Sequence, residues 1–134
     1  MEAKELMIGD WVSHKGTYVK IEDITTNSGR YKYPLSVFYS DGREFAHIAV
    51  LNVDPIPLTE EILLKNGFIW YGNTESWVHR AYPKLEAGVM KTHEKDKIFA
   101  WVSSYFKRIE YVHEFQHLLR LCGLSDLADK LKIE

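Results

Sequence analysis

The sequence predicts an α+β protein built from two small antiparallel β-sheets with helices at its C-terminal end. Two observations lead to this class. Short β-rich runs separated by turn residues occupy most of the chain up to Phe106, and the hydrophobic period becomes helical from Arg108 onward. Segregated strands and helices of this kind are typical of α+β folds.

The first 54 residues read as closely spaced strands. An Asp41-Gly42 pair separates two β-rich runs, and this dipeptide is a strong hairpin signal because the tight turn needs positive φ angles. Four or five short strands in so few residues predict a strongly bent, SH3-like sheet or barrel. The expected strands span 8–12, 17–24, 35–39 and 43–50.

Residues 55–134 form the second predicted part. Pro55 and Pro57 make a stiff break, Thr59 can cap a short helix, and Asn66-Gly67 can end it. A β-meander follows, with hairpins expected around residues 72–75 and 93–96. A helix is then expected from Arg108 to Cys122 and a last short one from Asp126 to Lys132, capped by Ser125. We expect residues 1–54 and 55–134 to pack as one compact unit, since each is small for an independent core.

Composition narrows the function classes only a little. The net charge of −2 does not indicate a polybasic or polyacidic partner, which makes nucleic acid an unlikely ligand. The single cysteine, Cys122, rules out a disulfide within the chain, and its apolar surroundings predict a small buried residue. The charged N-terminus has no signal-peptide pattern and no apolar run suits a bilayer, so we expect a cytoplasmic protein without membrane contact.

One motif carries recognisable chemistry. His113, Glu114 and His117 match the H-E-x-x-H pattern of zinc metallopeptidases. On a helix, residues four apart share a face, so both imidazoles can bind one Zn²⁺ while the glutamate acts as general base on the metal-bound water. The motif therefore supports a small zinc-dependent hydrolase as an alternative function, with zinc as its cofactor.

Other features argue against this alternative. A catalytic zinc needs a third protein ligand, and Arg120 occupies the glycine position of the extended motif. His79 and His93 are upstream candidates, but nothing in the sequence selects either. The helical period also places His113 and His117 opposite the apolar stripe, where a solvated polar face would explain them without metal.

Three segments, Ile8–Val12, Pro57–Phe68 and Tyr111–Leu118, together resemble a family of small proteins from gut Bacteroides-type bacteria, their phages and integrated elements. The resemblance covers residues 5 to 124. Members of that family often read Tyr-Val-His-Gln-Leu-Gln-Asn at the last segment, which keeps the equivalents of His113 and Gln116 but not those of Glu114 or His117. The resemblance implies that H-E-x-x-H is a local coincidence in this chain, and it transfers no activity, because the family has none assigned.

A second alternative uses the aromatic residues of the C-terminal sheet as a stacking platform for single-stranded nucleic acid. The simpler interpretation is that they form the core of a small sheet. An exposed aromatic patch for a protein partner is a third use that the sequence cannot separate from stacking. The platform would comprise Trp70, Tyr71, Trp77, Trp101, Tyr105 and Phe106, with positive charge from Lys91, Lys95, Lys97, Lys107 and Arg108.

We therefore expect a non-enzymatic binding or accessory protein of phage or mobile-element origin, without a cofactor and with an unknown partner, possibly another protein. The zinc-dependent hydrolase and the nucleic-acid-binding module are the alternatives.

Overall fold

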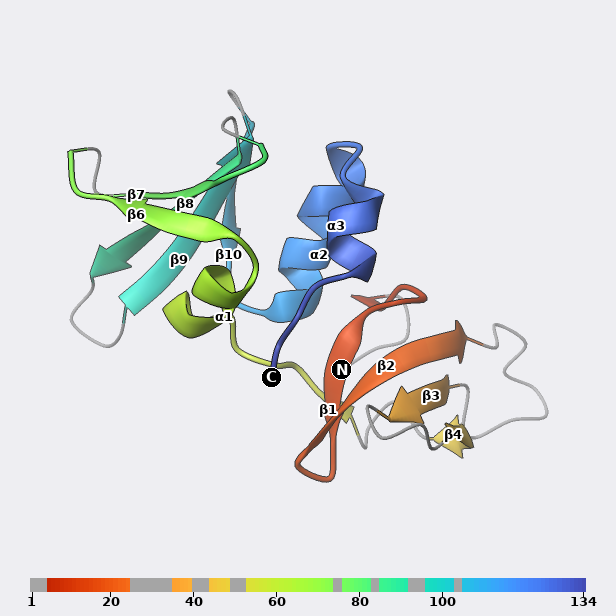
Figure 1. Ribbon diagram of the computed structural model, residues 1–134. Helices are drawn as coiled ribbons and strands as arrows, with labels where there is room; N and C mark the ends of the chain where they lie inside the picture. Colours follow the sequence, from red (N-terminus) through yellow and green to blue (C-terminus); the bar gives the residue numbers. More distant parts are fainter. Residues whose placement is uncertain are drawn as a thin grey trace. The chain divides into compact units, whose positions relative to one another are not determined.

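The computed structural model describes residues 5–24, 35–39, 44–48, 53–73, 76–82, 85–91, 96–102 and 105–134 (Figure 1). The chain divides into two compact units, an N-terminal unit of Met1–Ile56 and a C-terminal unit of Pro57–Glu134. Each unit contains one antiparallel five-stranded sheet, and the described α-helices belong to the C-terminal unit. The predicted α+β class is confirmed. The division falls two residues after the predicted boundary, and joint packing of the two units stays a prediction.

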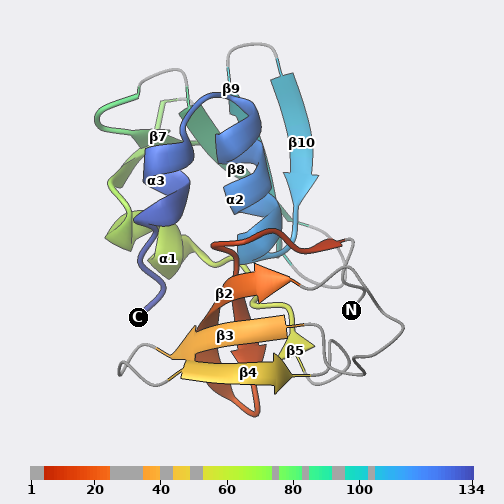
Figure 2. The same cartoon turned by 90° about the vertical axis from the view of Figure 1, so that its right-hand side faces the viewer.

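The sheet of the N-terminal unit has the order β4-β3-β2-β1-β5, visible in part in Figure 2. Its strands are β1 (Trp11–His14), β2 (Thr17–Ile24), β3 (Leu35–Tyr39), β4 (Glu44–Ile48) and β5 (Val53–Asp54). The predicted strands match closely, except that the first begins at Trp11 because a turn around Gly9, with φ 93°, precedes it. The Asp41-Gly42 turn lies outside the described residues, although the strands beside it pair as a hairpin requires. Among the described strand pairs the sheet is open, so barrel closure of the SH3-like kind stays a prediction.

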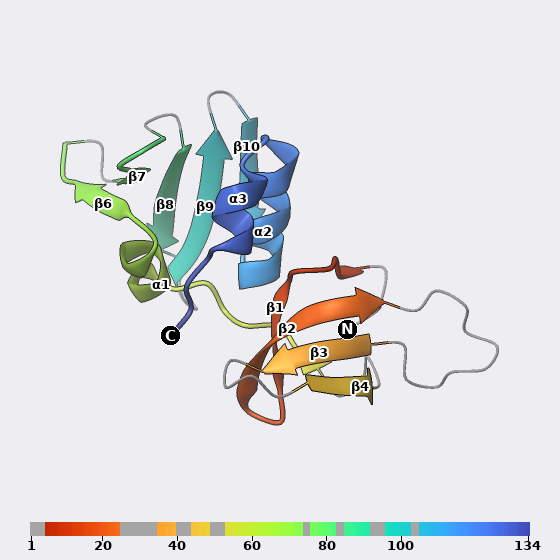
Figure 3. The same ribbon diagram turned by 45° about the vertical axis from the view of Figure 1, so that its right-hand side comes forward.

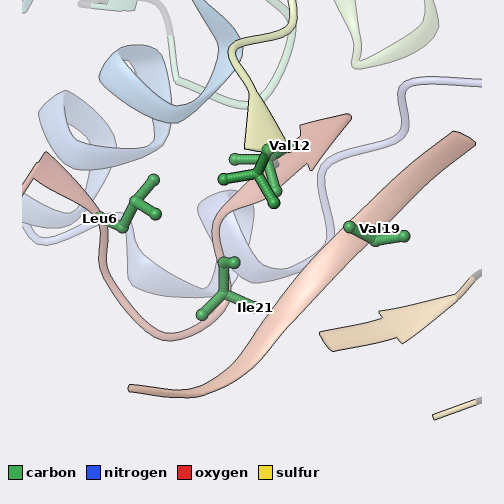
Figure 4. Packing of buried hydrophobic residues seen from close by; sticks show 5 residues of the cluster. Leu6, Val12, Val19 and Ile21 are labelled. Carbon is green, nitrogen blue, oxygen red and sulfur yellow. The ribbon is translucent and has the colours of Figure 1, made fainter. Parts of the chain in front are cut away.

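Alternation along β1 and β2 builds the core of the N-terminal unit. Val12 lies opposite Val19 across the two strands, and both are fully buried. Burying a side chain of this size contributes about 1.5–3 kcal/mol. Figure 4 labels Leu6 from the segment before β1, Val12 from β1, and Val19 and Ile21 from β2. The buried cluster consists of Leu6, Val12, Val19, Ile21 and Val53.

The C-terminal unit begins with α1 (Glu60–Lys65), which is capped as predicted. The Thr59 hydroxyl accepts the Ile62 N–H, and Gly67 follows the helix with φ 87°. The sheet then has the order β10-β9-β8-β7-β6. Its strands are β6 (Phe68–Tyr71), β7 (Ser76–His79), β8 (Leu85–Lys91), β9 (Asp96–Val102) and β10 (Tyr105–Ile109). Residues 93–95 of the second predicted hairpin turn lie outside the described residues.

The predicted helix from Arg108 to Cys122 is wrong at its start. Residues 105–109 form β10, which pairs with β9 along its whole length, and α2 spans Val112–Leu121. The last helix, α3, spans Ser125–Asp129 and not Asp126–Lys132, with Leu124 and not Ser125 at the N-cap. The helix does not reach Lys132, because the backbone N–H and carbonyl of Lys132 are hydrogen-bonded to the side chain of Asn66. Figure 3 shows α2 and α3 side by side on one face of the C-terminal sheet. No described helix is long and apolar enough to cross a membrane.

Candidate functional site

The two histidines of the H-E-x-x-H segment lie one turn apart on α2, as the motif requires. Their ring centroids are 5.7 Å apart with the ring planes at 77°, and the ring of Tyr111 stacks on His113 at 5.9 Å. His117 is half-buried, whereas His113 is only 7% exposed. The prediction of a solvated histidine face is therefore wrong for His113. The helix buries a wider face than its apolar stripe, because Gln116 is buried beside His113.

Glu114 occupies the position of the general base, but its carboxylate has another role. Oε1 accepts the backbone N–H of Tyr111 at 3.0 Å and that of Glu110 at 3.1 Å. Tyr111 is the N-cap residue and Glu114 the third residue of the helix, which is the glutamate position of a capping box. The carboxylate thus satisfies backbone donors at the start of α2, and its negative charge lies at the positive end of the helix dipole.

The described residues supply two of the three protein ligands that a catalytic zinc needs. Within them, no group of three or more His, Cys, Asp or Glu side chains lies close enough together to hold a metal ion. His93 lies outside the described residues. His79 is not grouped with the α2 histidines, because it lies in a separate set of contacts with Phe68, Tyr82 and Ala81. The described donor set does not complete a catalytic zinc site.

Gln116 is a polar residue of α2 for which no functional role was predicted. It is fully buried, and its Nε2 donates to the backbone carbonyl of Ala128 at 3.1 Å, which joins α2 to α3. A buried amide without such a partner would cost free energy, so this bond fixes how the two helices pack. The helical period could have placed Gln116 beside Val112 and Leu119, but no sequence signal identifies its acceptor.

A second polar cluster lies at the end of α1. The Asn66 amide donates to the Ile62 carbonyl at 2.7 Å and to the Lys132 carbonyl at 2.6 Å, and its oxygen accepts the Lys132 N–H at 2.7 Å. These bonds tie the segment after α3 to the end of α1. Leu131 and Ile133, on either side of Lys132, are buried.

His79 completes this cluster from β7. Its Nδ1 accepts the Ala81 N–H at 3.0 Å, so the proton of the neutral ring is on Nε2, which donates to the Asn66 backbone carbonyl. Burial lowers the pKa of His79 below its ordinary value, and the bond to Asn66 opposes that shift. The ring also packs edge-on against Phe68 with centroids 5.1 Å apart. These contacts give His79 a structural role as a neutral ring.

The predicted aromatic platform is described only in part. Trp70 and Tyr71 on β6 are 45% and 50% exposed, and the ring of Trp70 lies 5.5 Å from that of half-buried Trp77. Arg108 pairs with Glu110, so its charge is locally neutralised. The side chains of the remaining predicted members, Trp101, Tyr105, Phe106, Lys91, Lys95, Lys97 and Lys107, lie outside what the structure describes.

Comparisons with protein-family models, with curated proteins and with solved structures found no match to this chain.

Proposed function

We propose that this chain is a non-enzymatic binding or accessory protein of a phage or mobile element, with another protein as its partner. The observation that carries the proposal is the position of Glu114. A general base must reach the metal-bound water, whereas this carboxylate binds two backbone N–H groups at the start of its own helix. The resemblance of Pro57–Phe68 and Tyr111–Leu118 to proteins of phages and integrated elements supports the origin.

Bound zinc distinguishes this proposal from a zinc-dependent hydrolase. Zinc would be measured by elemental analysis on untagged protein purified without chelator, beside His117→Ala and the double variant His113→Ala/His117→Ala. The single variant guards against misfolding, because His117 is half-buried while His113 is buried. We expect substoichiometric zinc in all three proteins and no hydrolysis of peptide or ester substrates. Near-stoichiometric zinc that is lost in both variants, together with hydrolysis, would overturn the proposal.

A protein partner is favoured over nucleic acid on charge. The chain carries 17 Lys and Arg against 19 Asp and Glu, and Arg108 is paired with Glu110. Single-strand binding depends on phosphate neutralisation as well as on stacking. Titration with a single-stranded oligonucleotide at low salt, followed by tryptophan fluorescence, should therefore leave the emission unchanged. Saturable quenching that weakens with added salt would instead support the nucleic-acid-binding module.

A further inference from the structure

The four edge strands of the two described sheets differ in charge. Native sheets commonly protect their edges from pairing with another chain by placing charged residues or proline there. Glu44 lies in β4, Asp54 in β5, and Lys107 with Arg108 in β10. The fourth edge strand, β6, reads Phe-Ile-Trp-Tyr and has neither a charge nor a proline. This strand lacks the protection that the other three edges carry.

The hydrogen-bond alternation of an antiparallel pair shows which residues of β6 turn toward the open edge. The Arg80 N–H donates to the Gly67 carbonyl at 2.9 Å, so these two residues form a hydrogen-bonded pair. Alternate residues Ile69 and Tyr71 then bond to β7, while Phe68 and Trp70 direct their backbone groups outward. Phe68 is buried, so Trp70 is where the edge is accessible.

Symmetric pairing with a second copy suits the charge of this edge. In an antiparallel contact about a two-fold axis, the residues closest to the axis lie near their own counterparts, so a charge there would meet a like charge. The eight residues Asn66–Asn73 contain no charged side chain. A register that places Trp70 opposite the same residue of the second copy joins the outward N–H and C=O groups of both. It also brings together two exposed Trp70 rings, each already in contact with Trp77.

We propose that two copies of this chain associate through β6, antiparallel and centred on Trp70, so that two five-stranded sheets join into one. The proposal is independent of the proposed function. It identifies a second copy as the partner that pairs with β6. If a strand from a different protein paired there instead, the purified chain alone would be monomeric.

Sedimentation velocity of the full chain from about 1 µM to about 1 mM tests the association. We expect the mass to rise from 15.7 kDa toward twice that value as the concentration increases. A monomeric mass over the whole range would overturn the proposal. This first result needs no variant, so it stands even if an edge substitution prevents folding.

Charge substitution at Tyr71 tests the location and the symmetry. The two copies of residue 71 would lie diagonally across the axis, within reach of long side chains, so Tyr71→Lys and Tyr71→Glu should each weaken the dimer at least about tenfold. An equimolar mixture of the two variants should restore association. Leu121→Lys, at a 69% exposed residue of α2, is the matched control and should leave it unchanged. Circular dichroism would verify folding. A dimer that persists in both Tyr71 variants, or a mixture without recovery, would overturn the proposed interface.

Discussion

The N-terminus of α2 and the C-terminus of α1 show the same need met in two ways. Each helix end leaves backbone groups without helical partners. At α2, the Glu114 carboxylate accepts backbone N–H groups from the residues three and four positions before it, so the helix provides its own capping group. At α1, Asn66 closes its own helix and also bonds Lys132, 66 residues later, while His79 contacts the end from β7. The start of α2, which carries the H-E-x-x-H motif, is capped by a residue of the same helix. The end of α1, which carries no motif, is bonded to residues far away in the sequence.

Gly67→Ala should have the largest effect on this comparison. An added Cβ would lie 3.0 Å from Nε2 of His79, and the residue has φ 87°. We expect a loss of about 3 kcal/mol in the free energy of unfolding, from backbone strain together with the clash. Urea denaturation of the full chain would measure it.

Gly123→Ala is the matched control for Gly67→Ala. Gly123 has φ 80° in the same unit, but an added Cβ there would meet nothing within 4 Å, so only the backbone strain of about 1–2 kcal/mol applies. Equal losses in the two variants would show that the approach of His79 to Gly67 is unimportant.

Asn66→Ala should come next, with a loss of about 2 kcal/mol, because three hydrogen bonds at the surface of the unit disappear. Asn66→Asp keeps the acceptor for the Lys132 N–H but places a carboxylate oxygen against the Ile62 and Lys132 carbonyl oxygens at the negative end of α1, so its loss should be at least as large. Hydrogen exchange at the Lys132 amide would separate the two variants. Faster exchange is expected in Asn66→Ala alone, and equal protection in all three proteins would contradict the contact.

Glu114→Ala should cost less, about 1 kcal/mol, because a local cap at a partly exposed helix end is lost. Glu114→Gln retains a capping-box acceptor and should lose less still. Thermal unfolding monitored by circular dichroism would compare both with the wild type. Full stability of Glu114→Ala would show that the carboxylate does not cap the helix, and would return it to consideration as a base.

The smallest expected effect is a pH dependence from His79. Its folded pKa lies below the unfolded value of about 6.5, so the unfolded chain binds a proton more readily. The stability from neutral His79 is complete above the unfolded pKa and declines as pH falls through it toward the folded pKa. Burial lowers the pKa of His14 as well, with a smaller contribution from Lys15, and acts in the same direction.

Free energies of unfolding at pH 7.5 and 5.5 would measure this dependence in the wild type, His79→Gln and His14→Gln. Each substitution should reduce the difference between the two pH values. A difference that is unchanged in both variants would assign the pH dependence to other groups.

Local rules account for what the sequence predicts well. Thr59 before Glu60 and Gly67 after Asn66 gave the limits of α1, because caps act over a few residues. The strands around residues 17–24 and 35–39 follow from alternation and turn residues. β10 was missed because pairing with β9, a tertiary interaction, overrode a helical reading of Arg108 and Ile109.

The candidate site shows which features such local rules do not predict. Helical spacing correctly placed His113 and His117 one turn apart, since the period determines it. The burial of His113, the bond from Gln116 to Ala128 and the role of His79 depend on which elements pack together. Spacing along one helix carries no information about those neighbours.

The bond between Asn66 and Lys132 also has a consequence for biosynthesis. The end of α1 leaves the ribosome 66 residues before the backbone groups that it binds. At typical elongation rates this interval is roughly 3 to 13 seconds. During that time the C-terminal unit lacks the contact that closes it, while every residue of the N-terminal unit has already been synthesised. Released chains that end shortly before Lys132 should therefore be cleaved by protease within residues 57–131, and the full chain should resist.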